Sequence, residues 1–324
     1  ATQKGMVKMK DEKLIGINNQ EKDGLKDFRV RSISKSKDGV YFISSSGGIF
    51  EYDLNSFQKI MTEQGLKSNE CIFDIKLSDN GILWAGGNQG LYKIDNDIVT
   101  KIYDKDNSKL QNDFVLDLEF SRDGSLWIVQ NSKVSRLVND KIEDLTTLLK
   151  IPKSLEVKDI EFDNNGDIWI ATTFGLGEFK NDTLIIYNES NGTIQPKANC
   201  AVTIGNNNEI IYSTYGSGFS IFDGENFINY NTENGLSNNN VEEIAVDSKN
   251  NYWIALDGGA VQMFDGENFN QHKIKDGVSS DESFTLYVDD LDNVWVGTYG
   301  GGVCFYDGNI WNSIDSRDGL HNNT

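Results

Sequence analysis

Histidine is nearly absent from this 324-residue sequence, which contains only His272 and His321. General acid–base catalysis and nucleophile–histidine triads most often depend on a histidine side chain. Because the sequence offers only two histidine side chains, mechanisms that depend on histidine are not expected. We therefore expect a protein that is not an enzyme.

Cysteine and long apolar runs are also scarce. Cys71, Cys200 and Cys304 are odd in number and far apart in the chain, so a disulfide framework is not expected. Each stands among apolar residues, which is typical of a small buried thiol. No run approaches the roughly 18 apolar residues of a membrane-spanning helix, so we expect no direct membrane insertion.

Basic residues are outnumbered by acidic ones, with 30 Lys and Arg against 50 Asp and Glu and a formal net charge of -20. The acidic residues are spread along the chain rather than gathered in a tail. Nucleic acids and anionic membrane surfaces attract basic surfaces, so this composition argues against both as partners.

What the sequence does contain is one unit that recurs seven times. An aromatic or apolar residue within a short apolar run returns every 42 or 43 residues, at Phe42, Trp84, Trp127, Trp169, Ile211, Trp253 and Trp295. Self-similarity with a period of about 40–45 residues is typical of β-propellers. We therefore predict an all-β fold, a seven-bladed β-propeller of four-stranded antiparallel blades.

The sixth copy shows the expected blade most clearly. Strands are predicted over 241–246, 252–256, 260–264 and 268–272, separated by turns rich in Asp, Asn and Gly. Runs such as 168–170 are apolar at consecutive positions, as in strands covered on both faces. The repeated tryptophan is therefore interpreted as core between blades rather than as a surface for stacking sugars. Pairs such as Gly235-Leu236 and Gly277-Val278 mark the boundaries between repeats.

The two ends of the chain leave a choice open. Residues 1–11 are polar and lack periodicity, so we expect a flexible leader followed by one propeller domain over 12–324. Residues 12–18 and 310–314 both suit the outermost strand of the last blade. We expect that blade to be closed by both termini, because this covers an exposed edge. A spare N-terminal strand and a continuation into a second propeller are the alternatives.

The repeats carry a family resemblance. The segments 79–92 (DNGILWAGGNQGLY), 164–176 (NNGDIWIATTFGL) and 292–303 (DNVWVGTYGGGV) show it best. Over about residues 12–324 the chain resembles the two-component regulator propeller repeat. This resemblance implies the extracytoplasmic sensor region of a bacterial hybrid two-component system, periplasmic or secreted after removal of a signal peptide, and often a glycan ligand. The sequence shows no kinase region, so signalling would need further sequence or a partner.

Candidate binding residues follow from the same period. Four positions after the repeated aromatic, on the turn between the second and third strands, the chain carries polar or aromatic residues, and Phe174 follows one position later. Equivalent turns of a propeller converge on one face, and aromatic platforms beside hydrogen-bonding groups suit a sugar or small polar ligand. The predicted ligand-binding residues are Asn88, Asn131, Phe174, Tyr215, Asp257 and Tyr299. The alternative is that these are solvent-exposed turn residues with no common ligand.

Acidic residues also recur ten positions before the repeated aromatic, within the ring Ser32, Asp74, Asp117, Asp159, Ala201, Glu243 and Thr285. They could line a channel and hold a cation, but capping of neighbouring backbone groups is the preferred interpretation. The segment from Asp104 to Ser108 has the odd spacing of a calcium loop. Lys109 stands where that loop needs Gly and Val115 where it needs Glu, which excludes an EF-hand. We expect neither a metal site nor a cofactor.

Taken together, the sequence predicts a non-catalytic ligand-binding propeller that senses an oligosaccharide or another small polar ligand for a two-component system. One alternative is a scaffolding propeller that binds a protein partner through the same face. A second is an enzyme similar to the streptogramin lyases, which would use His272 and a carboxylate.

Overall fold

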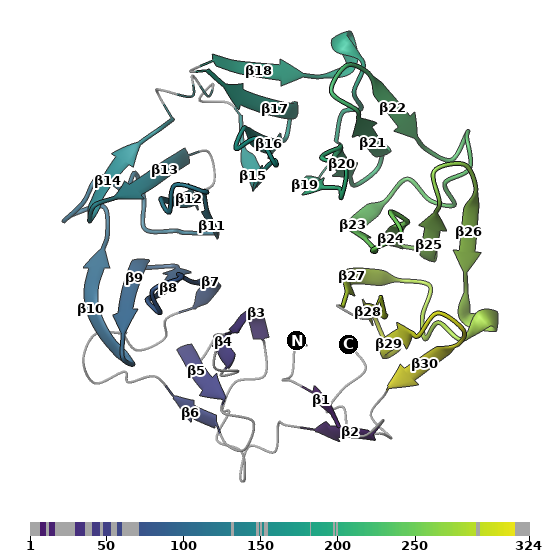
Figure 1. The fold of residues 1–324 in the computed structure, drawn as a ribbon, viewed down its shortest axis with the longest axis horizontal. Helices are drawn as coiled ribbons and strands as arrows, with labels where there is room; N and C mark the ends of the chain where they lie inside the picture. The colour runs from purple at the N-terminus through teal and green to yellow at the C-terminus, as the bar shows by residue number, and fades with distance from the viewer. Residues whose placement is uncertain are drawn as a thin grey trace. The chain divides into compact units, whose positions relative to one another are not determined.

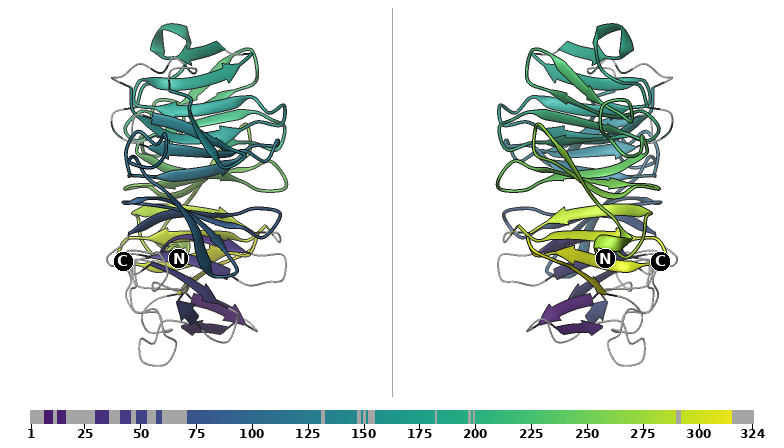
Figure 2. Two further views of the ribbon diagram at one scale, coloured as in Figure 1. Left: turned by 90° about the vertical axis from the view of Figure 1, so that its left-hand side faces the viewer. Right: turned by 90° about the vertical axis from the view of Figure 1, so that its right-hand side faces the viewer.

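The computed structural model shows an all-β chain that divides into two compact units, Ala1–Ser154 and Leu155–Thr324, each described by itself. From residue 71 to 314 it describes all residues except 131–132, 147–148, 150, 152–154, 182, 197, 199 and 290–291. Before residue 71 it describes only the strands. The strands are labelled in Figure 1 and can be followed from the side in Figure 2.

The first unit contains one two-stranded and three four-stranded sheets. Its strands are β1 (Val7–Lys10), β2 (Lys13–Gly16), β3 (Val30–Lys35), β4 (Tyr41–Ser45), β5 (Gly48–Tyr52), β6 (Phe57–Lys59), β7 (Ile72–Leu77), β8 (Leu83–Gly87), β9 (Gly90–Asp95), β10 (Ile98–Tyr103), β11 (Asp117–Phe120), β12 (Leu126–Gln130), β13 (Lys133–Val138) and β14 (Lys141–Asp144). Strands that follow one another in the chain are neighbours in each four-stranded sheet.

The second unit contains four four-stranded sheets built in the same way. They comprise β15 (Val157–Phe162), β16 (Ile168–Thr172), β17 (Gly175–Lys180), β18 (Thr183–Tyr187), β19 (Cys200–Ile204), β20 (Ile210–Thr214), β21 (Gly218–Phe222), β22 (Phe227–Tyr230), β23 (Val241–Val246), β24 (Tyr252–Leu256), β25 (Ala260–Phe264), β26 (Phe269–His272), β27 (Ser283–Val288), β28 (Val294–Thr298), β29 (Gly302–Tyr306) and β30 (Trp311–Ile314). Two short 3₁₀ turns, η1 (Glu189–Asn191) and η2 (Ile274–Asp276), are the helical elements of the described residues.

These sheets agree with the predicted propeller blade. All pairings are antiparallel between consecutive strands, and tight turns with positive φ join them, as at Asn139 (φ 49°) and Asp140 (φ 59°). Asn and Asp tolerate this left-handed backbone better than most residues. The four predicted strands of the sixth repeat match β23 to β26 closely. An arrangement of all sheets as seven blades of one ring stays a prediction, because the two units are described separately.

The second strand forms the core of five of the described sheets, as the consecutive apolar residues predict, whereas β28 alternates buried and half-buried residues. Every residue of β8, β12, β16, β20 and β24 is buried. Trp253 is 4% exposed and packs with Val278, Leu286 and Val294 of the next sheet. Its Nε1 donates a hydrogen bond to Asp247 Oδ2 at 3.0 Å, and Trp295 Nε1 donates to Asp289 Oδ2 at 2.9 Å. Trp253 therefore packs against the next sheet, while both indole N–H groups are anchored to the turn of their own sheet.

The glycine pairs at the repeat boundaries have a structural role. Gly235 (φ 123°) and Gly277 (φ 110°) adopt a left-handed backbone that glycine reaches without steric cost. The next residues, Leu236 and Val278, are 3% and 1% exposed and so anchor the connection in the core. The prediction that these pairs separate repeats is confirmed.

The ends of the chain differ from the prediction. Val7–Lys10, within the expected leader, forms β1 and pairs with β2, which falls in the segment expected to close the last blade. That blade instead consists of β27 to β30, and β30 pairs with β29 across a short turn. A local hairpin costs less loop-closure entropy than a pairing between distant ends of the chain. Residues 17–29 and 315–324 lie outside the described residues.

Candidate functional site on the turn face

The described members of the predicted binding set lie where the second strand of a sheet ends and the first strand begins, an end that we call the turn face. In the second unit, adjacent turns are joined at this end. Asp257 N donates to Asn240 O at 3.1 Å within one sheet, and Asn240 forms a bridge with Tyr215 of the preceding sheet. Asp257 forms the equivalent bridge with Glu282 of the following sheet. The turns are therefore held in fixed relative positions.

Two of the predicted residues contact each other directly. Tyr215 OH donates a hydrogen bond to Asp257 Oδ2 at 2.7 Å, and this bond and the charge of Asp257 raise the pKa of Tyr215. Burial, together with the charge of Asp257, raises the pKa of the nearby Glu242 carboxyl. Tyr215, Asp257 and Glu242 thus form a polar cluster with one ring and two carboxyl groups. Such a cluster can accept hydrogen bonds from hydroxyl or amide groups of a ligand.

Two exposed rings stand on other turns of the second unit. Phe174, between β16 and β17, is 51% exposed, and Tyr299, between β28 and β29, is 55% exposed. Tyr299 N donates to Glu282 O at 2.9 Å, which fixes the backbone of its turn. The following Gly301 lies against Ser279, where an added Cβ would come within 2.5 Å of the carbonyl oxygen. Both rings are accessible, as a stacking platform requires.

In the first unit, one of the two predicted residues is described. Asn88 Oδ1 accepts a hydrogen bond from Cys71 N at 3.0 Å, so its side chain supports the backbone of its own sheet. Asn131 lies outside the described residues. Sequence reasoning missed Phe114, which is 49% exposed just before β11 and stacks on Phe73 with ring centroids 6.3 Å apart. The sequence feature that could have identified Phe114 is an aromatic residue shortly before the first strand of a sheet. The prediction considered only residues that follow the second strand.

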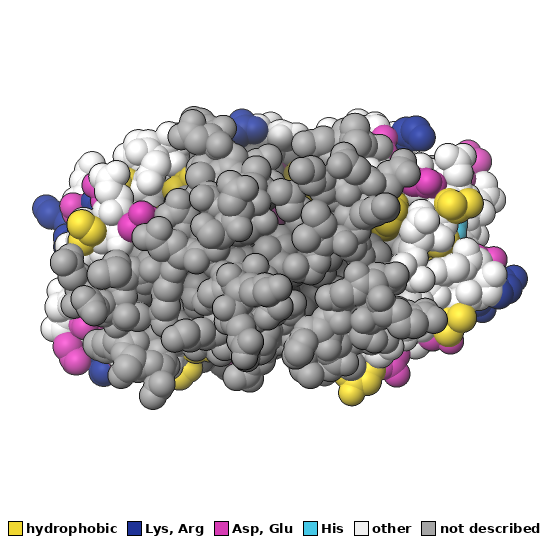
Figure 3. All heavy atoms as spheres, turned by 90° about the horizontal axis from the view of Figure 1, so that it is seen from below, with side chains coloured by type: hydrophobic (Ala, Val, Ile, Leu, Met, Phe, Trp, Pro, Cys, Tyr) yellow, Lys and Arg dark blue, Asp and Glu magenta, His cyan; other side chains and the backbone are white. Residues whose placement is uncertain are grey.

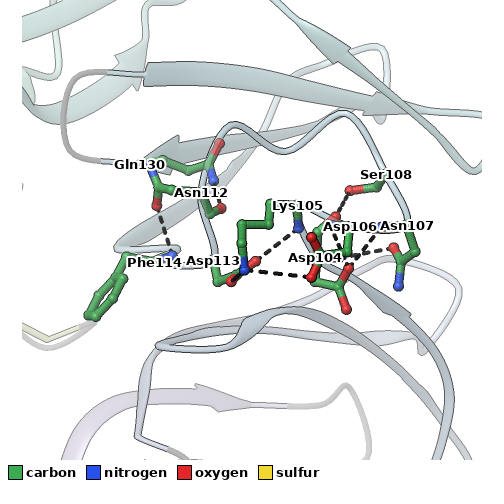
Figure 4. Close-up of polar contacts among 9 residues, drawn as sticks. All are labelled: Asp104, Lys105, Asp106, Asn107, Ser108, Asn112, Asp113, Phe114 and Gln130. Atoms are coloured by element: carbon green, nitrogen blue, oxygen red, sulfur yellow. Dashed lines mark hydrogen bonds and ion pairs between the residues drawn. The ribbon is translucent and has the colours of Figure 1, made fainter.

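The loop that carries Phe114 is tied down by polar contacts (Figure 4). Lys105 Nζ pairs with Asp113 Oδ2 at 2.7 Å, and Gln130 Nε2 donates to the carbonyl of Asn112. Asn112 Oδ1 accepts from Phe114 N at 2.8 Å. The exposed ring is thus presented by an ordered loop.

The segment with calcium-loop spacing forms part of the same loop. Asp104 Oδ1 accepts hydrogen bonds from Asp106 N at 3.0 Å and Asn107 N at 2.9 Å (Figure 4). The carboxylate therefore caps a turn, which agrees with the exclusion of an EF-hand.

The recurring carboxylates of the first strands hold neighbouring sheets together. Asp74 accepts from Leu118 N at 3.1 Å, Asp159 from Val202 N at 3.0 Å, and Glu243 from Leu286 N at 2.7 Å. We call these three contacts the carboxylate latches. The capping interpretation is confirmed for these residues. Within the described part of the chain, no three His, Cys, Asp or Glu side chains are grouped to hold a metal ion.

The surface and the helices add two observations. Among the coloured atoms of Figure 3, acidic and basic side chains are interspersed with hydrophobic ones. No helix in the described part of the chain is long and apolar enough to cross a membrane.

Comparison with known proteins places this fold among repeat proteins of the propeller type. No protein-family model matches the chain, and no curated protein matches it. The fold is similar to the extracellular domain of a hybrid two-component system from B. thetaiotaomicron. The repeat pattern of the sequence predicts this similarity of fold. That match has 19% identity and a TM-score of 0.58 and covers 97% of this chain. The chain spans only 50% of that protein's resolved chain.

Other solved structures are equally similar in fold. Virginiamycin B lyase from Staphylococcus aureus matches with 12% identity and a TM-score of 0.63, over 89% of this chain and 96% of the lyase. A surface component of the type-IX secretion system of Porphyromonas gingivalis matches with 13% identity and a TM-score of 0.62, over 85% of this chain and 46% of that protein. At these identities the likeness concerns the fold alone.

Proposed function

We propose that this chain is a non-catalytic ligand-binding propeller, the extracytoplasmic sensor part of a bacterial two-component system, with a glycan or other small polar ligand on the turn face. The proposal includes closure of the sheets into a seven-bladed ring and export by a signal peptide. The contact between Tyr215 and Asp257 carries it, because two residues 42 positions apart meet on adjacent turns. The likeness to the extracellular domain of a two-component system supports it.

The chemistry of the cluster favours binding over catalysis. Its described members offer carboxyl and phenol groups, whereas His272 lies on β26, the outermost strand of its sheet. A lyase that uses His272 would need a separate site on that strand. The exposed rings Phe174 and Tyr299 supply apolar surface for stacking, and Asp257 and Glu242 supply acceptors for hydroxyl groups.

A thermal-shift screen against neutral oligosaccharides tests the proposal. A ligand that binds only the folded state raises the melting temperature. The double variant Tyr215→Ala/Tyr299→Ala should lose this shift. Tyr287→Ala is the matched control, since Tyr287 is 62% exposed near the opposite end of β27. Unchanged binding by the folded double variant would contradict the site.

A scaffold that binds a protein partner is the second candidate. The stacked Phe73 and Phe114 and the 36% exposed Leu116 favour it, because they place apolar surface on the turn face of the first unit. Absence of any oligosaccharide shift, with loss of a co-purifying protein in Phe114→Ser, would favour this function.

A further inference from the structure

A groove between two sheets of the second unit stands apart from the turn face. It lies between β24–β26 and β29–β30, with a volume of about 1040 Å³. Four rings lie against it, those of Trp253, His272, Tyr306 and Trp311, with adjacent centroids 5.3–5.6 Å apart. A cavity of this size suits a small organic ligand.

The repeat offers an internal comparison. The equivalent groove of the first unit, beside Trp84, has a volume of about 320 Å³. There the chain supplies its own cation: Lys93 Nζ lies 5.5 Å from the ring centroid of Trp84 and pairs with Asp140 at 3.0 Å. Tyr103 OH donates to the same carboxylate at 3.0 Å. An ammonium group over an indole ring beside a carboxylate is a favourable cation–π arrangement.

The second unit replaces these groups. Trp84 pairs across its hairpin with Lys93, whereas Trp253 pairs with Met263, so the ammonium group is missing. Tyr103 stands 19 residues after Trp84, and His272 stands at the same distance after Trp253. Two ring positions are thus kept and the ammonium group is removed, while Tyr306 and Trp311 replace the Leu137 and Ile142 of the first unit.

The charges around the groove remain acidic. Its rim carries the carboxylates of Asp276, Asp292 and Asp307 against the single ammonium group of Lys249, and the carboxylate of Asp247 lies buried beneath Trp253 Nε1. Local turns hold these carboxylates in place: Asp307 Oδ1, for example, accepts from Asn309 N and Ile310 N at 2.8 Å each. Those bonds lower the pKa of Asp307, which keeps it ionised at neutral pH. The rim therefore attracts a cation.

His272 adds a directional group. Trp311 Nε1 donates to His272 Nδ1 at 3.1 Å, which leaves the ring proton on Nε2. That buried Nε2 has no hydrogen-bond partner among the described residues. Burial lowers the pKa of His272, so the neutral ring does not repel a cation at neutral pH. The Nε2–H group of His272 would therefore be satisfied by an oxygen acceptor on a ligand.

From these observations we propose that the groove between β24–β26 and β29–β30 binds an organic ammonium ion that also carries an oxygen acceptor. The ammonium group replaces the one that Lys93 supplies in the first unit and lies among the aromatic rings inside the acidic rim. The oxygen accepts the proton of His272 Nε2. This site does not depend on the proposed function of the turn face.

Isothermal titration with three probes of nearly equal shape tests the proposal. Choline has the charge and the oxygen, tetramethylammonium has only the charge, and 3,3-dimethylbutan-1-ol has only the oxygen. We expect choline to bind at one site per chain, about tenfold more tightly than the uncharged alcohol. We also expect tetramethylammonium to bind more weakly than choline. Absence of choline binding, or equal binding of the alcohol, would overturn the proposal.

Two variants make the test specific. Met263→Lys places the chain's own ammonium group opposite Trp253 and should abolish choline binding. His272→Tyr restores the residue found at this position in the first unit and should weaken binding at least tenfold, even if Met263→Lys fails to fold. Tyr287→Leu, outside the groove, should bind choline as the unaltered protein does. Undiminished choline binding in a folded Met263→Lys or His272→Tyr protein would contradict the assignment.

Discussion

Removal of one carboxylate latch should weaken the second unit by a predictable amount. Glu243 Oε2 accepts the backbone N–H of Leu286 at 2.7 Å, and Leu286 is only 4% exposed. A hydrogen bond to a charged group contributes about 1.5–3 kcal/mol, and a buried donor without a partner costs about 1–3 kcal/mol. We therefore expect Glu243→Ala to lower the free energy of unfolding by about 2 kcal/mol. Glu243→Gln keeps a neutral acceptor and should cost about 1 kcal/mol.

Denaturant unfolding followed by tryptophan fluorescence measures this loss, with circular dichroism as a second probe of whether the transition is two-state. Added calcium should leave the transition midpoint of the unaltered protein unchanged, since the carboxylate already holds a backbone donor. The latch would be refuted if Glu243→Ala cost less than about 0.5 kcal/mol, which is the scale of an ordinary surface substitution. If Glu243→Gln lost as much free energy of unfolding as Glu243→Ala, the stabilisation would depend on the negative charge of Glu243 rather than on its acceptor oxygen.

Three further substitutions test the packing and electrostatics described above. Gly301→Ala should destabilise the fold by about 1–3 kcal/mol in denaturant unfolding, because its Cβ would lie 2.5 Å from Ser279 O; no loss would mean that the turn relaxes freely. Trp253→Phe should cost about 1–3 kcal/mol, since Asp247 loses a buried donor and the core loses volume; an unchanged midpoint would contradict this role. Glu242 has a raised pKa in the fold, so its contribution to stability is present below the ordinary carboxyl pKa and is lost as the pH rises through the folded value. Glu242→Gln should therefore raise the melting temperature at neutral pH but not below pH of about 4, and a pH-independent effect would contradict the shift.

The blades could be predicted from the sequence because their determinants are local. Turn residues such as Asn139 and Asp140, and the buried run around Trp253, act within one hairpin or one sheet. The pairing of β2 was not predictable in this way. Its residues suit an edge strand in several places, and only the folded chain decides that it pairs with β1.

The candidate site was predictable only where the period applies. Counting 42 residues from Tyr215 leads to Asp257, and the structure joins the two side chains. Phe114 was not predicted because it precedes β11, the first strand of its sheet. The prediction considered only residues that follow the second strand of a sheet. Asn88 has the predicted position, but its hydrogen bond to Cys71 shows that position in the repeat does not determine which group a side chain contacts.

His272 shows how a departure from the repeat can separate binding from stability. In the first unit, Tyr103 at this position reaches Asp140 through its hydroxyl group, whereas His272 Nε2 is buried without a partner among the described residues. Such a donor costs about 1–3 kcal/mol. His272→Tyr removes this donor, but it also removes the Nδ1 atom that accepts the Trp311 N–H, so the two effects offset each other. We therefore expect the free energy of unfolding to change by less than about 1 kcal/mol while choline binding weakens. Denaturant unfolding without ligand measures the first effect, and a loss of more than about 2 kcal/mol would show that histidine serves the packing of this groove instead.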